Sequence, residues 1–133
     1  MSIPATHRVA HAIVKALDHP QCVESLSVWG RAATAAPGTL RMWCDAIDVR
    51  PRDVLGFITA LWAIQGARRL GVSPGDLLPF AEKRTLHRFL ERSGPLGSES
   101  DVVSTNDFCA RQTFLSHRYV IEEVKRLSAE DRN

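Results

Sequence analysis

Two segments of the chain carry hydroxyl, basic and aromatic side chains in the same order. Residues 39–45 are Thr-Leu-Arg-Met-Trp-Cys-Asp, and residues 85–91, which lie 46 positions later, are Thr-Leu-His-Arg-Phe-Leu-Glu. An arginine can form two hydrogen bonds with the edge of a guanine, and a threonine can contact a base edge or a phosphate. The duplicated pattern therefore favours a repeated helical unit whose polar side chains contact nucleic acid.

The spacing within each segment separates a packing side from an exposed side. The leucine and the aromatic residue lie three positions apart on one face of a helix, while the polar residues point away from it. We expect Arg41 and Thr39 to contact bases, and Lys83, Arg84 and Arg88 to contact phosphates. The complete set of candidate DNA-contacting residues is Gly38, Thr39, Arg41, Met42, Asp45, Lys83, Arg84, Thr85, His87, Arg88 and Arg92.

Residues 26–47 meet the requirements of a helix-turn-helix. Such a motif needs a small residue in the first helix, so that the two helices can approach, and apolar residues that attach the second helix to the core. Gly30 is the small residue, Thr34 lies at the turn, and Leu40 and Trp43 are the attaching residues. The start of the second helix would enter the major groove of DNA.

Apolar periodicity and helix-ending residues predict an all-α fold, because no segment alternates with the period of a strand. We predict that residues 1–94 form a domain with two helix-turn-helix units and that residues 95–133 form a linker and a helical extension. The composition of residues 94–100 is typical of a linker. Ser104 or Thr105 can cap one helix of this extension and Ser116 another. The predicted helices cover residues 6–18, 23–33, 37–48, 51–70, 74–80 and 83–93, with a further one from 105 to 114.

The helix at residues 51–70 is expected to be the central strut of the domain. Pro51 opens it and Gly71 ends it, and its apolar side chains cover so wide an arc that neighbours must enclose it. At ~1.5 Å per residue the helix would be roughly 30 Å long. That length is close to the ~34 Å between successive major grooves on one side of a duplex.

Residues 6–94 resemble the DNA-binding domain of AraC-type transcription regulators. The resemblance is carried by residues 26–32 (Leu-Ser-Val-Trp-Gly-Arg-Ala), residues 39–43, Pro51 and residues 85–89. It implies two helix-turn-helix units joined by a long helix, with both recognition helices facing one side of double-stranded DNA. It also implies a companion domain for ligand binding or dimerisation, and no such domain is visible in the sequence.

The second unit departs from the family pattern. When Leu86 is aligned with Leu40, Asp76 occupies the position of Gly30, and the glycine-phenylalanine pair that usually precedes the second recognition helix is missing. We therefore expect the second unit to bind phosphates more than bases. A competing interpretation is that Arg84, Arg88 and Arg92 form a solvated face whose charges are balanced by Glu91 or by acidic residues of the extension.

The charge of the chain is distributed unevenly. Residues 1–94 carry 12 Lys and Arg against 8 Asp and Glu, whereas residues 95–133 carry 5 against 7. A basic domain suits contact with a polyanion. The mildly acidic extension could fold over the basic face, or pair with a second subunit in a homodimer.

Composition excludes several other classes of protein. A hydrophobic share of 44% and a charged share of 24% are ordinary for a globular domain, and the longest apolar run, residues 54–64, is too short to cross a membrane. The first 17 residues lack the apolar core of a secretory signal. The three cysteines are widely spaced and suggest buried thiols in a reducing compartment. We expect a cytoplasmic protein.

Neither catalysis nor a cofactor is expected. His7, His11, His19 and Cys22 invite a zinc interpretation, but the glutamate of an HExxH motif is missing and no second ligand pair completes a closed site. The chain also lacks GxSxG, GxxxxGK[ST] and GxGxxG motifs. The sequence therefore predicts a sequence-specific double-stranded DNA-binding transcription regulator. The alternative is a helical protein-interaction module that has lost DNA binding.

Overall fold

The computed structural model describes residues 4–132, with side chains up to residue 128. Within that range the chain forms eight helices and one two-stranded ribbon, so the all-α prediction is confirmed. The helices α4 and α6 have the bounds predicted from the sequence. The helices are α1 (Ala5–Leu17), α2 (Leu26–Ala33), α3 (Pro37–Ala46), α4 (Pro51–Leu70), α5 (Pro74–Leu77), α6 (Lys83–Ser93), α7 (Thr105–Arg111) and α8 (Arg118–Arg132).

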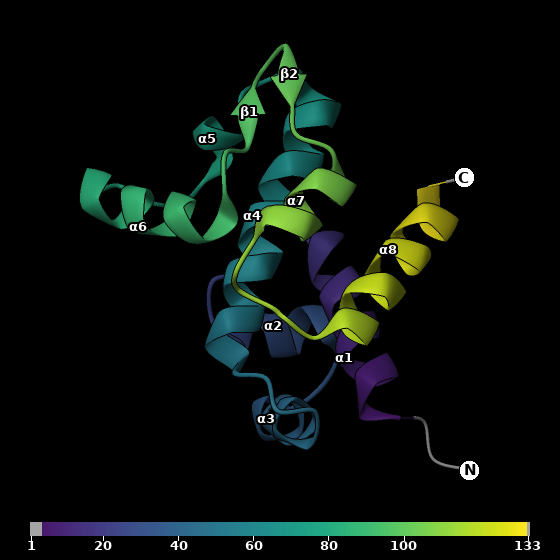
Figure 1. Cartoon of the computed structure of the whole chain (residues 1–133). Helices are drawn as coiled ribbons and strands as arrows, with labels where there is room; N and C mark the ends of the chain where they lie inside the picture. Colours follow the sequence, from purple (N-terminus) through teal and green to yellow (C-terminus); the bar gives the residue numbers. More distant parts are fainter. Residues whose placement is uncertain (1–3, 133) are drawn as a thin grey trace.

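Helix α4 is the central element (Figure 1), and α1, α2, α3, α5, α6 and α7 all contact it. Its first turn begins at Pro51, whose fixed backbone favours that position, and it ends at Gly71, which has the left-handed φ of 70°. Val54, Phe57, Ile58, Leu61 and Ile64 are fully buried along it. The predicted central strut is therefore enclosed on nearly all sides.

Helices α1, α2 and α3 pack against one another around Trp29. The side chain of Trp29 is fully buried, and its indole nitrogen donates a hydrogen bond to the backbone oxygen of Ala12 at 3.0 Å. Helix α2 begins after Ser25, whose hydroxyl accepts a hydrogen bond from the backbone nitrogen of Val28. These three helices hold the first predicted recognition helix in a continuous core.

The segment predicted as a linker is packed against the rest of the molecule. Strands β1 (Gly97–Ser98) and β2 (Asp101–Val102) pair antiparallel, with Gly97 opposite Val102, and they contact α5 and α4. Leu96, which precedes the ribbon, is buried. Two-residue strands are too short to show an alternating pattern, so they could not be predicted from residue spacing.

The helices after the ribbon complete the same hydrophobic core. Ser104 caps α7 by accepting a hydrogen bond from the backbone nitrogen of Asp107 at 3.0 Å, and the ring of Phe108 lies 5.4 Å from that of Phe57. Helix α8 packs along α1, on the opposite side of the molecule from α6 (Figure 1). The hypothesis that the acidic extension folds over the basic recognition helices is therefore wrong for this structure.

Several predicted helix ends are corrected by local hydrogen bonds. Helix α7 ends at Arg111 instead of residue 114, because the side chain of Gln112 bonds both the backbone nitrogen and the backbone oxygen of Leu115. His117, not Ser116, accepts the hydrogen bond at the start of α8, from the backbone nitrogen of Val120. Helix α3 ends at Ala46, because Asp48 adopts a left-handed φ of 59°.

No helix within residues 4–132 has both the length and the apolar character needed to span a membrane.

Candidate nucleic-acid interface

The connection between α2 and α3 is a tight turn of three residues. Thr34 adopts the left-handed φ of 56°, and the backbone nitrogen of Ala35 donates a hydrogen bond to the oxygen of Gly30 at 2.9 Å. A Cβ at residue 30 would lie 2.6 Å from the backbone oxygen of Ala35, so only glycine permits this approach. The roles predicted for Gly30 and Thr34 agree with this geometry.

Helix α3 exposes most of its predicted contact residues. Gly38, Arg41, Met42 and Asp45 are exposed, and Met42 is 60% exposed despite its apolar side chain. Thr39 is half-buried, one helical turn before Trp43 on the side that faces α1. Arg41 is therefore better placed than Thr39 to contact a base.

The inner face of α3 differs from the prediction at one residue. Leu40 and Cys44 are buried, whereas Trp43 is half-buried at the boundary with α1. The guanidinium of Arg8 on α1 lies 5.4 Å from the centre of the Trp43 ring system. Leu40 and Cys44 thus attach α3 to the core, and Trp43 closes the edge between α3 and α1.

Helix α6 presents a basic face to solvent. Lys83, Arg84, Thr85, His87 and Arg88 are all exposed. Among the side chains that the structure describes, no acidic group forms an ion pair with Lys83, Arg84 or Arg88. The competing interpretation, in which neighbouring acids balance this helix, is not supported at these three residues, which keep their charge available for a partner.

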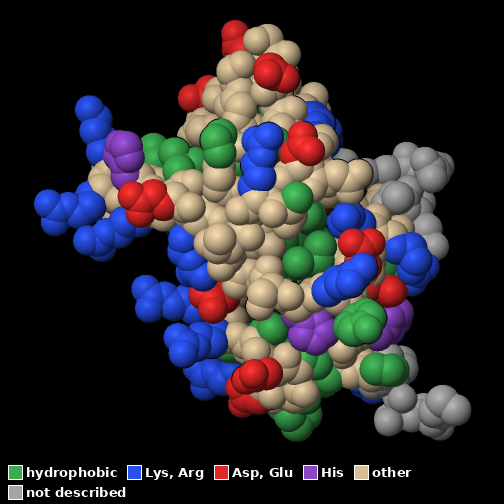
Figure 2. Space-filling view, in the orientation of Figure 1, with side chains coloured by type: hydrophobic (Ala, Val, Ile, Leu, Met, Phe, Trp, Pro, Cys, Tyr) green, Lys and Arg blue, Asp and Glu red, His purple; other side chains and the backbone are tan. Residues whose placement is uncertain are grey.

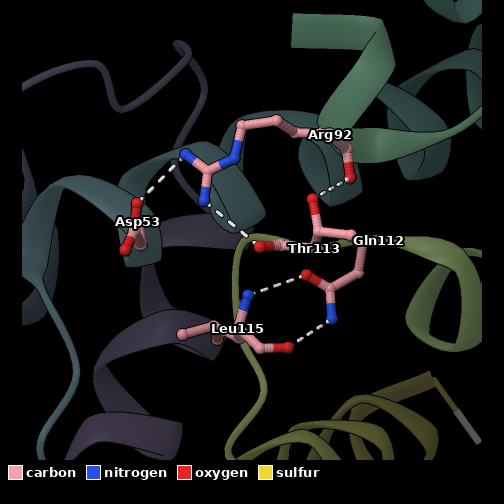
Figure 3. A network of polar contacts seen from close by, with 5 residues as sticks. All are labelled: Asp53, Arg92, Gln112, Thr113 and Leu115. Atoms are coloured by element: carbon pink, nitrogen blue, oxygen red, sulfur yellow. Dashed lines mark hydrogen bonds and ion pairs between the residues drawn. The ribbon is translucent and has the colours of Figure 1, made fainter.

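Arg92 has a different role from the other basic residues of α6 (Figure 3). Its guanidinium forms an ion pair with Asp53 at 3.1 Å and donates to the backbone oxygen of Thr113 at 3.2 Å. The guanidinium also lies 4.7 Å from the centre of the Phe114 ring. Arg92 was predicted to contact DNA, but its side chain instead connects α6 to the first turn of α4 and to the segment before α8.

The segment 112–115 holds the end of α6 from the other side. The backbone nitrogen of Thr113 donates a hydrogen bond to the backbone oxygen of Arg92 at 2.7 Å, and the ring of Phe114 lies 5.2 Å from that of Phe89. Phe114 also lies so close to Gly56 that a Cβ there would be 2.6 Å from its ring. We call Asp53, Arg92, Thr113 and Phe114 the α6 clamp.

The placement of α6 relative to α3 differs from the expectation that the strut separates the two recognition helices. Arg92 in the last turn of α6 contacts Asp53 in the first turn of α4, so α6 lies beside the beginning of the strut and not at its far end. Figure 1 shows α3 along its axis and α6 from the side, so the two helices do not run parallel. Helix α6 lies at this place because α5 is only a single turn and residues 78–82 lead the chain back along α4.

One edge of the molecule gathers Lys and Arg side chains. Figure 2 shows them around α6 and downward past the start of α4 toward α3. Arg50 and Arg52, which flank Pro51, are exposed at this start of α4. Neither arginine is among the residues predicted to contact DNA, although two arginines around a helix-opening proline are a signal for exposed charge beside α3.

The cysteines and histidines form neither a nucleophile nor a metal site in the part of the chain that the structure describes. Burial raises the pKa of Cys44 and that of Cys109 to about 11, so both thiols stay protonated at neutral pH. Desolvation also raises the pKa of the half-buried Cys22, which donates a hydrogen bond to Thr59. No three His, Cys, Asp or Glu side chains described here converge as metal ligands.

Comparison with protein-family models, with curated proteins and with solved structures gives no match to this chain.

Proposed function

We propose that this chain is a sequence-specific double-stranded DNA-binding transcription regulator without catalytic activity. The observation that carries the proposal is the pairing of a tightly turned α2–α3 unit with a basic edge formed by α6 and the start of α4. The first feature presents a helix of the size and exposure that fit a major groove. The second supplies the positive charge that holds a phosphate backbone.

The two recognition helices would have different roles, with α3 contacting bases and α6 contacting phosphates. Arg41 lies on a helix held by core contacts on its inner face, so its guanidinium can be presented to a guanine in a fixed geometry. Lys83, Arg84 and Arg88 lie on a helix that extends from the molecule and have no described ion-pair partner. Phosphate contacts tolerate a less fixed geometry, so α6 would add affinity with little sequence preference.

Localisation and partners follow from the same proposal. A transcription regulator of this kind would act in the cytoplasm on double-stranded DNA and would need no cofactor. Tyr119, at the start of α8, is 75% exposed. A homodimer formed through the extension would use this large aromatic side chain in its interface.

The rival function is a helical protein-interaction module. It is favoured by the non-parallel arrangement of α3 and α6 and by the exposed apolar side chains Met42 and Leu70. Such an interface would depend weakly on salt, whereas DNA binding through phosphates falls with a log-log slope of about −0.9 per contact. Salt dependence therefore separates the two functions.

Fluorescence-anisotropy binding to a randomised duplex pool, at ~50 and ~200 mM salt, tests the proposal. The retained duplexes are then sequenced. We expect salt-sensitive binding and an enriched motif. Salt-sensitive binding without a motif would reduce the function to nonspecific DNA binding, and absence of binding at both salt concentrations would support the interaction module.

A further inference from the structure

A cavity of about 260 Å³ lies between α1 and the α2–α3 unit, away from the exposed face of α3. Successive turns of α1 line it with His7, Arg8, His11, Ala12 and Lys15. Ala33 at the end of α2 and Trp43 of α3 complete the lining. The cavity therefore touches all three helices of the first DNA-binding unit.

The lining combines cations with an apolar surface. Arg8 and Lys15 are the basic side chains of the lining apart from its two histidines, and none of the described residues that line the cavity is acidic. Glu123, outside the lining, pairs with His7 at 3.4 Å and also with Arg126. Ala12, Ala33 and the exposed part of Trp43 supply the apolar surface.

This combination matches the chemistry of a small aromatic anion. A carboxylate gains charge-assisted hydrogen bonds from arginine and lysine, and an attached planar ring gains contact with alanine methyl groups and an indole. Arg8 already lies over the Trp43 ring system, 5.4 Å from its centre. A carboxylate bound by Arg8 would thus place its ring beside Trp43.

The volume also fits a ligand of this class. Small-molecule sites are concave and equipped with a few convergent polar groups, and those that hold drug-sized ligands have volumes of about 300 to 1,000 Å³, so a cavity just below this range suits a smaller ligand. A cavity of about 260 Å³ suits one or two fused rings with one anionic group and is too small for a larger cofactor. The charged groups lie on α1, while the ring would contact α3.

We infer that the cavity between α1 and α3 binds a small aromatic carboxylate, with Arg8 and Lys15 holding the carboxylate and Trp43 contacting the ring. The ligand would bridge α1 to the recognition helix without covering Gly38, Arg41, Met42 or Asp45. It would therefore bind together with DNA and change the affinity of α3 for its site. The ligand site itself does not depend on the proposed DNA binding, whereas its effect on α3 rests on that proposed function.

Isothermal titration calorimetry with 1-naphthoate tests the inference. The comparison ligands are 1-naphthamide, which keeps the rings and removes the charge, and inorganic phosphate, which keeps a charge and removes the rings. We expect 1-naphthoate to bind about tenfold more tightly than either, since the carboxylate and the rings each contribute. No heat of binding with 1-naphthoate, or equal affinity for 1-naphthamide or for phosphate, would overturn the inference.

Substitutions then locate the site. Arg8→Gln and Lys15→Gln should each weaken 1-naphthoate binding by about tenfold. Arg69→Gln is the matched control, because Arg69 is an exposed helical cation outside the cavity and outside the proposed DNA-binding helices, and it should leave 1-naphthoate binding unchanged. Unchanged binding in both Arg8→Gln and Lys15→Gln would place the ligand elsewhere and reject the site.

Loss of Trp43 gives a second readout. Trp43→Leu should weaken 1-naphthoate binding, and because Trp43 also packs against the core, circular dichroism must first show that the variant is folded. If Trp43→Leu does not fold, the Arg8 and Lys15 variants alone test whether the ligand binds in this cavity. If the proposed DNA binding were wrong, the protein would show no affinity for duplexes. If the ligand site were wrong, calorimetry would show no heat of 1-naphthoate binding, so the two failures are distinguishable.

Discussion

Helix α3 is held by α1, α2 and the start of α4, whereas α6 contacts α4 and is attached at its end by the α6 clamp. The two helices start from corresponding residues, but the same position is buried differently in each. Leu40 is 1% exposed while Leu86 is half-buried, and the half-buried Trp43 corresponds to Phe89, which is buried.

This difference shows how a duplicated pattern can acquire two roles. A helix surrounded by a core has a fixed orientation, which base recognition requires, whereas a helix attached along one side can carry a dense positive charge far from other groups. The α6 clamp compensates for the weaker packing of the second helix. It draws on Thr113 and Phe114, which lie outside the duplicated region.

The largest expected effect is a difference in stability between variants of the two corresponding leucines. Leu40→Ala should lower the free energy of unfolding by about 3 kcal/mol, because a fully buried leucine leaves a cavity when truncated. Leu86→Ala should cost about 1 kcal/mol, since part of that side chain is already in water. Urea unfolding followed by circular dichroism measures both, and equal losses would remove the distinction between an embedded α3 and a peripheral α6.

The electrostatic contribution of α6 is tested by the triple variant Lys83→Gln, Arg84→Gln and Arg88→Gln. Its affinity for all duplexes should fall by roughly 100-fold at ~150 mM salt, and the log-log salt slope should become shallower by about 2.7. The control replaces Arg69, Arg118 and Lys125, which lie outside α3 and α6, by glutamine. If the control weakened binding as much, net charge and not α6 would hold the DNA.

Sequence preference is expected to depend on α3. Arg41→Ala should lose about 1 to 3 kcal/mol on the preferred duplex while affinity for random duplexes changes much less. Arg88→Ala should weaken binding to both kinds of duplex alike. Competition anisotropy with the two duplexes distinguishes these outcomes, and a uniform loss in Arg41→Ala would assign that arginine to a phosphate.

The smallest effect concerns the α6 clamp. Arg92→Lys keeps the charge but cannot reach Asp53 and Thr113 with the same planar group, so α6 should be held less firmly. We expect a loss of about 1 kcal/mol in unfolding free energy, because this pair is partly exposed, and a few-fold loss of DNA affinity. Arg88→Lys should change neither quantity, and equal behaviour of the two variants would mean that Arg92 does not position α6.

Local sequence signals were sufficient to predict several features of this protein. Pro51 and Gly71 predicted the bounds of α4, Gly30 and Thr34 predicted the tight turn between α2 and α3, and apolar spacing predicted that Leu40 would be buried. These features arise from backbone preference and from periodicity along one segment, which are properties of neighbouring residues. DNA binding itself stays a prediction.

The tertiary structure decided how the segments are combined. It placed Arg92 against Asp53 and Thr113 instead of toward a ligand, turned α6 away from the direction of α3, and packed α8 on α1 instead of over the basic edge. It also brought Arg8 and Trp43 together, although 35 positions separate them in the sequence. Each of these arrangements depends on contacts between distant segments, whose energies no local pattern of residues contains.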